Sequence, residues 1–430
     1  MSSDVSNDPF SRLHREDTRT ATAASPPMDV DYRGTQGPLF WLALRTALLT
    51  LITLGFYRFW AKTRIRKYFW SATAPGGDPM EYTGNGLEKL LGFLIAVAFL
   101  AIYLGLFQVL LSFVGLSVFS GGDGPESQVL QVALGQATLL AVIPFIFYAQ
   151  YRARRYILSR TRWRGVRFGV DAAAWGYVWR ALVHWFITII SLGLLLPRQT
   201  FWLEKYKIDR TWYGNTKFVQ GGKWTSLYPA MKHYFIAAGL IVVPSLLAWT
   251  TEQPVWLFFA FIGGVWFYYA FAYYAVESFR ILADQKRLGE RVGFITGPRA
   301  SKVFWTYIFG ALLASTCAGL VFSAFYVVAS NFMGLTTFGL LAEGEKLFNP
   351  ENMSIGFYIG GALFVIGYLA MLLSYGVFGM IFVSQPVLEH YVETTQILNP
   401  EALDDIQQRS RDEMVEAEGF ADALDVGAAI

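Results

Sequence analysis

Long apolar runs alternate with short polar segments through most of the chain. Six of these runs carry very few charges and are long enough for a helix to cross a bilayer, which takes about 20 residues. They cover residues 90–119, 129–151, 227–249, 254–276, 303–330 and 355–384. The pattern predicts an integral membrane protein with about six transmembrane helices.

Two further apolar runs, 39–60 and 175–197, are interrupted by charged residues. They align with each other in a single register, which indicates an internal duplication. The register places Gly55 opposite Gly193, so we take these glycines as candidate helix breaks. Broken helices at a repeat interface can frame a binding site, although a simple kink would also turn the chain back.

Short segments of alternating polarity that end in glycine precede several of the apolar helices, which is typical of a strand followed by a turn. They lie at 30–34, 80–84, 166–169, 216–222 and 292–297. We therefore expect an all-α integral membrane protein with internal duplication. It has about six transmembrane helices, two re-entrant or interfacial helical segments, and short β-hairpins on the cytoplasmic side.

The distribution of basic residues predicts the topology. If both interrupted runs re-enter the membrane, all the strongly basic loops lie on one side, and the loops on the other side contain a single basic residue, Lys346. The positive-inside rule makes the basic side cytoplasmic, with both termini there. The predicted parts are a disordered tail (1–28), two membrane repeats (29–174 and 175–302), a helical pair (303–398) and an acidic tail (399–430).

Composition and motifs limit the kinds of binding site and catalytic site that the chain can contain. Of the 430 residues, 54% are hydrophobic and 16% charged, and the net charge of +3 is too small to indicate nucleic-acid binding. The single Cys317 and four scattered histidines provide no metal-ligand spacing, and no phosphate loop or nucleophile elbow is present. We expect no enzyme activity, no cofactor and no metal.

An arginine cluster follows the second apolar run and is interleaved with aromatic residues. Guanidinium groups suit phosphates, and each basic residue near an anionic surface contributes about 1 kcal/mol. The cluster is either a topology signal that touches headgroups non-specifically or a pocket for an anionic lipid or phosphate. Its candidate residues are Arg152, Arg154, Arg155, Arg160, Arg162, Arg164 and Arg167, with Lys62, Arg64 and Arg66 as a smaller counterpart.

Residues 50–68 (TLITLGFYRFWAKTRIRKY), together with the Tyr-Thr-Gly-Asn-Gly motif at 82–86, form a distinctive pattern. With them the chain resembles the YjgN-like family of bacterial inner-membrane proteins over roughly residues 30 to 395. The second copy departs from the Trp-Ala-Lys-x-Arg pattern, with Trp-Leu-Glu-Lys at 202–205. The resemblance implies a bacterial cytoplasmic-membrane location and supplies no catalytic residues.

Two functional hypotheses follow. The first is a non-enzymatic multi-pass protein that binds or transports a small or amphipathic anionic solute or lipid. The alternative is a membrane scaffold that recruits a cytoplasmic protein through the hairpins and the acidic tail. The expected partners are membrane lipids and not nucleic acid. A homo-oligomer is compatible with either hypothesis.

Overall fold

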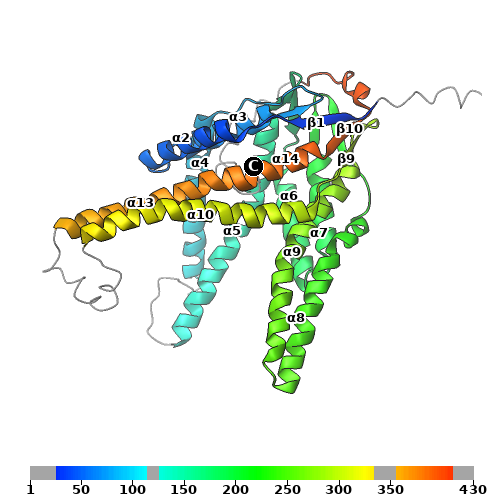
Figure 1. Cartoon of the computed structure of the whole chain (residues 1–430). Coiled ribbons are helices and arrows are strands. Elements are labelled where there is room, and N and C mark those ends of the chain that lie inside the picture. Colours follow the sequence, from blue (N-terminus) through cyan, green and yellow to red (C-terminus); the bar gives the residue numbers. More distant parts are fainter. Residues whose placement is uncertain (1–25, 114–124, 334–354, 410–430) are drawn as a thin grey trace, which may run out of the picture.

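Helical hairpins alternate with short strands along the chain in the computed structural model, which describes residues 26–113, 125–333 and 355–409 (Figure 1). Among these residues, six helices are long and apolar enough to cross a membrane. They are α4 (Gly86–Phe113), α5 (Pro125–Ser159), α8 (Lys232–Thr251), α9 (Val255–Asp284), α10 (Ala300–Met333) and α13 (Ile355–Gly379). The six predicted spans are confirmed by length and composition.

Most apolar side chains of these helices face outward. In the most apolar window of each helix, between 6% and 17% of the residues are buried inside the protein. Contiguous apolar surface of this extent is not stable in water. It is the expected surface of a helix surrounded by lipid tails.

Both interrupted apolar runs form helical hairpins. The first consists of α2 (Gln36–Ile52) and α3 (Arg58–Ala72), and the second of α6 (Ala174–Ile190) and α7 (Leu196–Ile208). The turns contain Gly55 and Gly193 in left-handed conformations, with φ of 94° and 85°.

Both hairpins begin and end beside the strands. At the base of the first, the Arg33 backbone N–H donates to the Ala72 carbonyl at 2.7 Å. At the base of the second, the Tyr206 hydroxyl donates to the Ala173 carbonyl at 2.9 Å. Each interrupted run therefore returns the chain to the layer from which it started.

The strands form one sheet of ten, in the order β2-β1-β10-β9-β8-β7-β6-β5-β4-β3, and every neighbouring pair is antiparallel. The five predicted strand segments lie in β1, β3, β5, β7 and β9. The strands are β1 (Met28–Tyr32), β2 (Thr73–Pro75), β3 (Glu81–Tyr82), β4 (Thr161–Trp163), β5 (Val166–Val170), β6 (Thr211–Tyr213), β7 (Thr216–Gln220), β8 (Lys286–Leu288), β9 (Val292–Thr296) and β10 (Thr395–Leu398).

This sheet corrects the expected all-α class. The strands are not separate hairpins but one curled sheet whose two edges approach each other. The edge strands β2 and β3 are consecutive in the chain, and the Met80 N–H beside β3 donates to the Thr73 carbonyl of β2 at 2.9 Å. Curling in this way leaves little open edge for unwanted strand pairing.

Aromatic side chains from successive strands form the core of the sheet. Phe168, Phe218 and Phe294 stack in series, with ring centroids 6.4 and 6.1 Å apart. Phe168 also packs on Tyr213, which packs on Trp163. The aromatic residues that recur in the predicted strand segments are thus the core of one shared layer.

The helical hairpins extend from this sheet in different directions. Figure 1 shows α4–α5 and α8–α9 extending the same way, whereas α10–α13 runs across them with α2 alongside. Phe40 of α2 packs on Phe378 of α13, with ring centroids 6.1 Å apart. After α13 the chain continues through a π-helical turn (Met380–Ser384) and α14 (Gln385–Glu393) to β10. Strands from the three central predicted parts, 29–174, 175–302 and 303–398, all join one sheet. The division of the chain into five parts therefore stays a prediction.

The described residues after 398 begin the predicted acidic tail. Within the described residues they form a short 3-10 helix, Pro400–Leu403, and no α-helix up to residue 409. The rest of the acidic tail lies outside the described residues.

Candidate functional site: an arginine-lined pocket

The predicted arginine cluster covers the end of α5 and the β4–β5 hairpin that follows it. This hairpin turns through Arg164 and Gly165, with φ of 47° and 75°. Two successive positive φ values characterise the tight hairpin turns that match the twist of paired strands. The turn holds β4 and β5 close together and brings their arginines to one end of the sheet.

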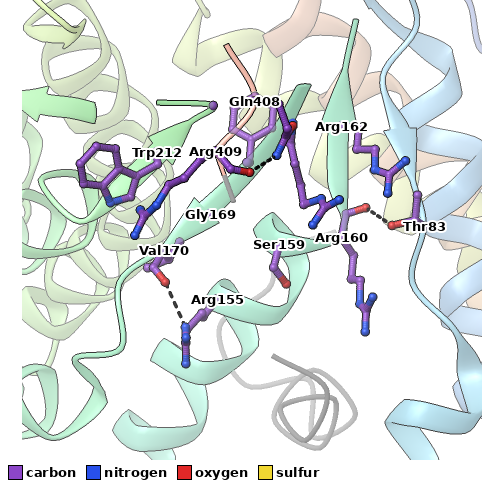
Figure 2. A pocket seen from close by; sticks show the side chains of 13 residues that line it. Thr83, Arg155, Ser159, Arg160, Arg162, Gly169, Val170, Trp212, Gln408 and Arg409 are labelled. Atoms are coloured by element: carbon purple, nitrogen blue, oxygen red, sulfur yellow. Dashed lines mark hydrogen bonds between the residues drawn. The ribbon is translucent and has the colours of Figure 1, made fainter. Parts of the chain in front are cut away.

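A pocket of about 180 Å³ lies between the end of α5, β3–β6 and the segment that follows β10. Five of its lining residues are arginines, and no described residue that lines it is acidic. Figure 2 shows Trp212 and Arg409 on one side of the pocket and Arg160, Arg162 and Thr83 on the other. The arginines are Arg155, Arg160, Arg162, Arg167 and Arg409.

Hydrogen bonds hold two of these arginines in place. Arg155 is buried, and its Nε donates to the Val170 carbonyl at 3.0 Å. Arg160 donates through Nη2 to Glu88 at the start of α4, at 2.9 Å. The pocket wall thus ties α5 to both β5 and α4.

Arg162 of β4 is the direct cross-strand partner of Arg167 of β5, and both side chains line the pocket. On its other side, Arg162 lies opposite Glu81 of β3. The β4–β5 pair thus adds two arginine side chains to the pocket wall.

The segment after β10 completes the pocket. The Gln408 side-chain oxygen accepts a hydrogen bond from the Arg167 backbone N–H at 2.8 Å. The Arg409 guanidinium lies 4.7 Å from the centre of the Trp212 ring, in cation–π geometry. It also lies 3.9 Å from the Asp171 carboxylate. The sequence interpretation missed Trp212, Gln408 and Arg409, because nothing in the local pattern connects them to the cluster.

The remaining predicted residues lie elsewhere. Arg152 donates to the Tyr148 hydroxyl at 2.9 Å, and Arg164 forms an exposed ion pair with Asp78 at 2.7 Å. On α3, Arg66 is buried against the Tyr82 ring. None of the six predicted residues Arg152, Arg154, Arg164, Lys62, Arg64 and Arg66 lines this pocket.

Within the part of the chain that the structure describes, six helices able to span a membrane and one sheet of ten strands define a multi-pass membrane protein. The chain belongs to the family described as "Bacterial protein of unknown function (DUF898)", whose model matches residues 27–423. It is 25% identical over 168 residues to the inner membrane protein YjgN of Salmonella typhimurium, and the match covers 38% of this chain and 37% of that protein. The predicted resemblance to YjgN-like proteins is thereby confirmed. No solved structure matches the chain.

Proposed function

We propose that the protein binds the phosphate group of an anionic ligand in the arginine pocket, at the cytoplasmic face of the bacterial inner membrane, without catalysing a reaction. The ligand is an anionic lipid headgroup or a soluble phosphate compound. The pocket supplies the same chemistry for both, because guanidinium groups donate paired hydrogen bonds to phosphate oxygens.

The observation that carries this proposal is the concentration of arginine side chains in the wall of one pocket. Five arginines line it, two of them opposite each other on neighbouring strands, with no acidic side chain among its described lining residues. An arginine patch that served only as a topology signal would not need a concave surface. It would also not need Arg409, more than two hundred residues further along the chain.

The proposed orientation follows from the hairpin geometry. Because α2–α3 and α6–α7 both return to the sheet, neither interrupted run carries the chain to the opposite side of the membrane. The sheet and its basic loops then share one side, which the positive-inside rule makes cytoplasmic. In this proposal the two broken hairpins are re-entrant or interfacial, and their shared geometry reflects an internal duplication.

Native mass spectrometry of the full-length protein in phosphatidylcholine nanodiscs tests the proposal. One arm adds phosphatidylglycerol to the nanodiscs, and the other adds inorganic pyrophosphate to the buffer. We expect a specific adduct in one arm, which identifies the source of the phosphate group. Arg162→Gln combined with Arg409→Gln should weaken it about tenfold or more, since hydrogen bonds to charged groups contribute about 1.5–3 kcal/mol each.

A matched control removes the same charge from the same sheet. Arg287 is exposed on β8, and Arg291 forms a long, exposed pair with Asp405. Arg287→Gln combined with Arg291→Gln should leave the adduct unchanged. Equal losses in both double variants, or no adduct in either arm, would refute a defined pocket. They would favour the alternative, a scaffold that recruits a cytoplasmic partner.

A further inference from the structure

A second cavity, of about 390 Å³, lies on another part of the molecule and shares no lining residue with the arginine pocket. Its walls come from the sheet-proximal ends of α5 and α9, from α6 and α7, and from the start of β8. It therefore lies where two membrane helices meet the second broken hairpin. Its volume is within the roughly 300–1,000 Å³ of small-molecule sites.

Charged groups gather along one part of this cavity. Glu204 and Lys207, one turn apart on α7, form an ion pair at 2.7 Å, and Lys286 of β8 joins them in the lining. Burial opposes ionisation of Glu204, but Lys207, Arg154 and Lys286 outweigh it and lower the pKa of that carboxyl. Burial lowers the pKa of Lys286; Glu204 opposes this shift, and the cations Arg154 and Lys207 add to it. Three cations thus surround one carboxylate, so the cluster has an excess of positive charge.

Two polar groups near this cluster lack partners. Gln199 lines the cavity and is only 6% exposed, yet its side-chain oxygen has no hydrogen-bond partner among the described residues. The Arg154 Nε is likewise buried without a hydrogen-bond partner there. Arg154 lies one helical turn beyond the lining residue Gln150, on the same side of α5. Buried polar groups are normally satisfied, so the vacant Arg154 Nε donor points to a ligand with a hydrogen-bond acceptor.

The rest of the lining is apolar. Phe147, Trp185, Leu203 and Phe279 contribute aromatic and aliphatic surface from four different helices. A purely polar anion would leave this surface uncovered. A ligand that fills the cavity therefore needs an apolar chain in addition to its charged group.

We propose that this cavity is a second binding site, which takes a single-chain amphiphile with an acidic headgroup. The headgroup is held by Lys207, Lys286 and Arg154, and the chain lies against the aromatic wall. A cationic amphiphile is excluded by the surplus of positive charge.

Laurate is the probe, titrated into the full-length protein in phosphatidylcholine nanodiscs and counted by native mass spectrometry. We expect saturable laurate binding, and no saturable binding of dodecyltrimethylammonium, which has a chain of the same length and the opposite charge. Lys207→Gln combined with Lys286→Gln should weaken laurate binding about tenfold or more. Lys67→Gln combined with Lys223→Gln, which removes two exposed lysines outside the cavity, should not.

A steric variant covers the case in which the charge variant fails to fold. Ala275 of α9 lines the cavity and is itself exposed, so Ala275→Trp should fill the space without touching a charged group. It should abolish laurate binding while the protein stays folded. Unchanged laurate binding in this variant, or equal retention of laurate and the cationic amphiphile, would overturn the proposal.

This test is separable from that of the arginine pocket. Arg162→Gln combined with Arg409→Gln should leave laurate binding intact, and Ala275→Trp should leave the phosphate adduct intact. If the phosphate adduct is absent and laurate still binds, the function proposed for the arginine pocket fails and the second site stands.

Discussion

Leu54 and Leu192 hold the same left-handed backbone conformation, with φ of 50° and 51°, at the tips of the two broken hairpins. Their side chains are 90% and 92% exposed. A leucine in the left-handed conformation costs roughly 1–2 kcal/mol in conformational free energy. Full exposure of its side chain to water would not offset this cost. The pairing of strain with apolar exposure supports the proposal that both hairpins enter the membrane.

We therefore expect a bimane label at residue 54 or 192 to be quenched by brominated lipids and shielded from iodide. The labels are placed on single cysteines in a Cys317→Ser background. A label at Lys223, exposed beside the sheet, should behave in the opposite way. Iodide quenching at both tips would show that the hairpins lie outside the membrane.

Alanine at Gly55 or Gly193 should destabilise the protein through the backbone alone. Both glycines have positive φ, and an added methyl group would meet no atom within 4 Å. The expected loss is about 1–2 kcal/mol in the free energy of unfolding. Thermal unfolding in detergent, followed by circular dichroism, measures it.

Gly105→Ala is the matched control, since Gly105 has equal space but ordinary helical geometry. Alanine is favoured over glycine inside a helix, so this variant should be neutral or slightly more stable. If all three substitutions behaved alike, the left-handed turns would not be needed for the fold.

Acidification should lower the free energy of unfolding of the protein, partly through Glu204. Burial disfavours its charge, but the neighbouring Lys207, Arg154 and Lys286 hold its pKa below the ordinary value of 4.5. A carboxyl whose pKa is lower in the folded state contributes stability above its unfolded pKa and loses it as the pH falls through the folded pKa. Unfolding free energy should therefore decline below about pH 4.5.

Glu204→Gln should flatten that decline, and Glu81→Gln, at an exposed position on β3, should not. Denaturant titrations between about pH 6 and pH 3 provide the comparison. An identical pH slope in wild type and Glu204→Gln would contradict the lowered pKa.

Removing the hydroxyl of Tyr213 should loosen the sheet core. Tyr213 is buried and donates to the Trp163 carbonyl at 3.1 Å. Tyr213→Phe keeps the ring packing and deletes the hydrogen bond, so we expect a loss of about 1 kcal/mol in unfolding free energy. Tyr358, which is largely exposed on α13, is the control, and Tyr358→Phe should have no effect on the same measurement.

The sequence predicted the features that depend on local pattern. Hydropathy located the spans, and alternation ending in glycine located half of the strands. Local sequence patterns could not predict which strands pair, because β1 joins β10 through contacts between residues at opposite ends of the chain. Strands of three residues, such as β2 and β6, carry no readable period of their own.

For a similar reason, the sequence predicted only some of the arginines that line the pocket. Consecutive helical residues point about 100° apart, so Arg154 and Arg155 diverge. Arg155 lines the arginine pocket, and Arg154 acts electrostatically on Glu204 in the second cavity. Arg409 joins the pocket only because the chain after β10 lies over the hairpin turns, which no local pattern could indicate.

The pairing of β1 with β10 also constrains the order of assembly during synthesis. Asp29 accepts a hydrogen bond from Gln396, 367 residues later. At about 5–20 residues per second, β1 waits on the order of 20–70 s before its partner leaves the ribosome. The transmembrane hairpins are therefore inserted before the sheet can be completed. A nascent or truncated chain that lacks β10 leaves one side of β1 unpaired and open to other strands.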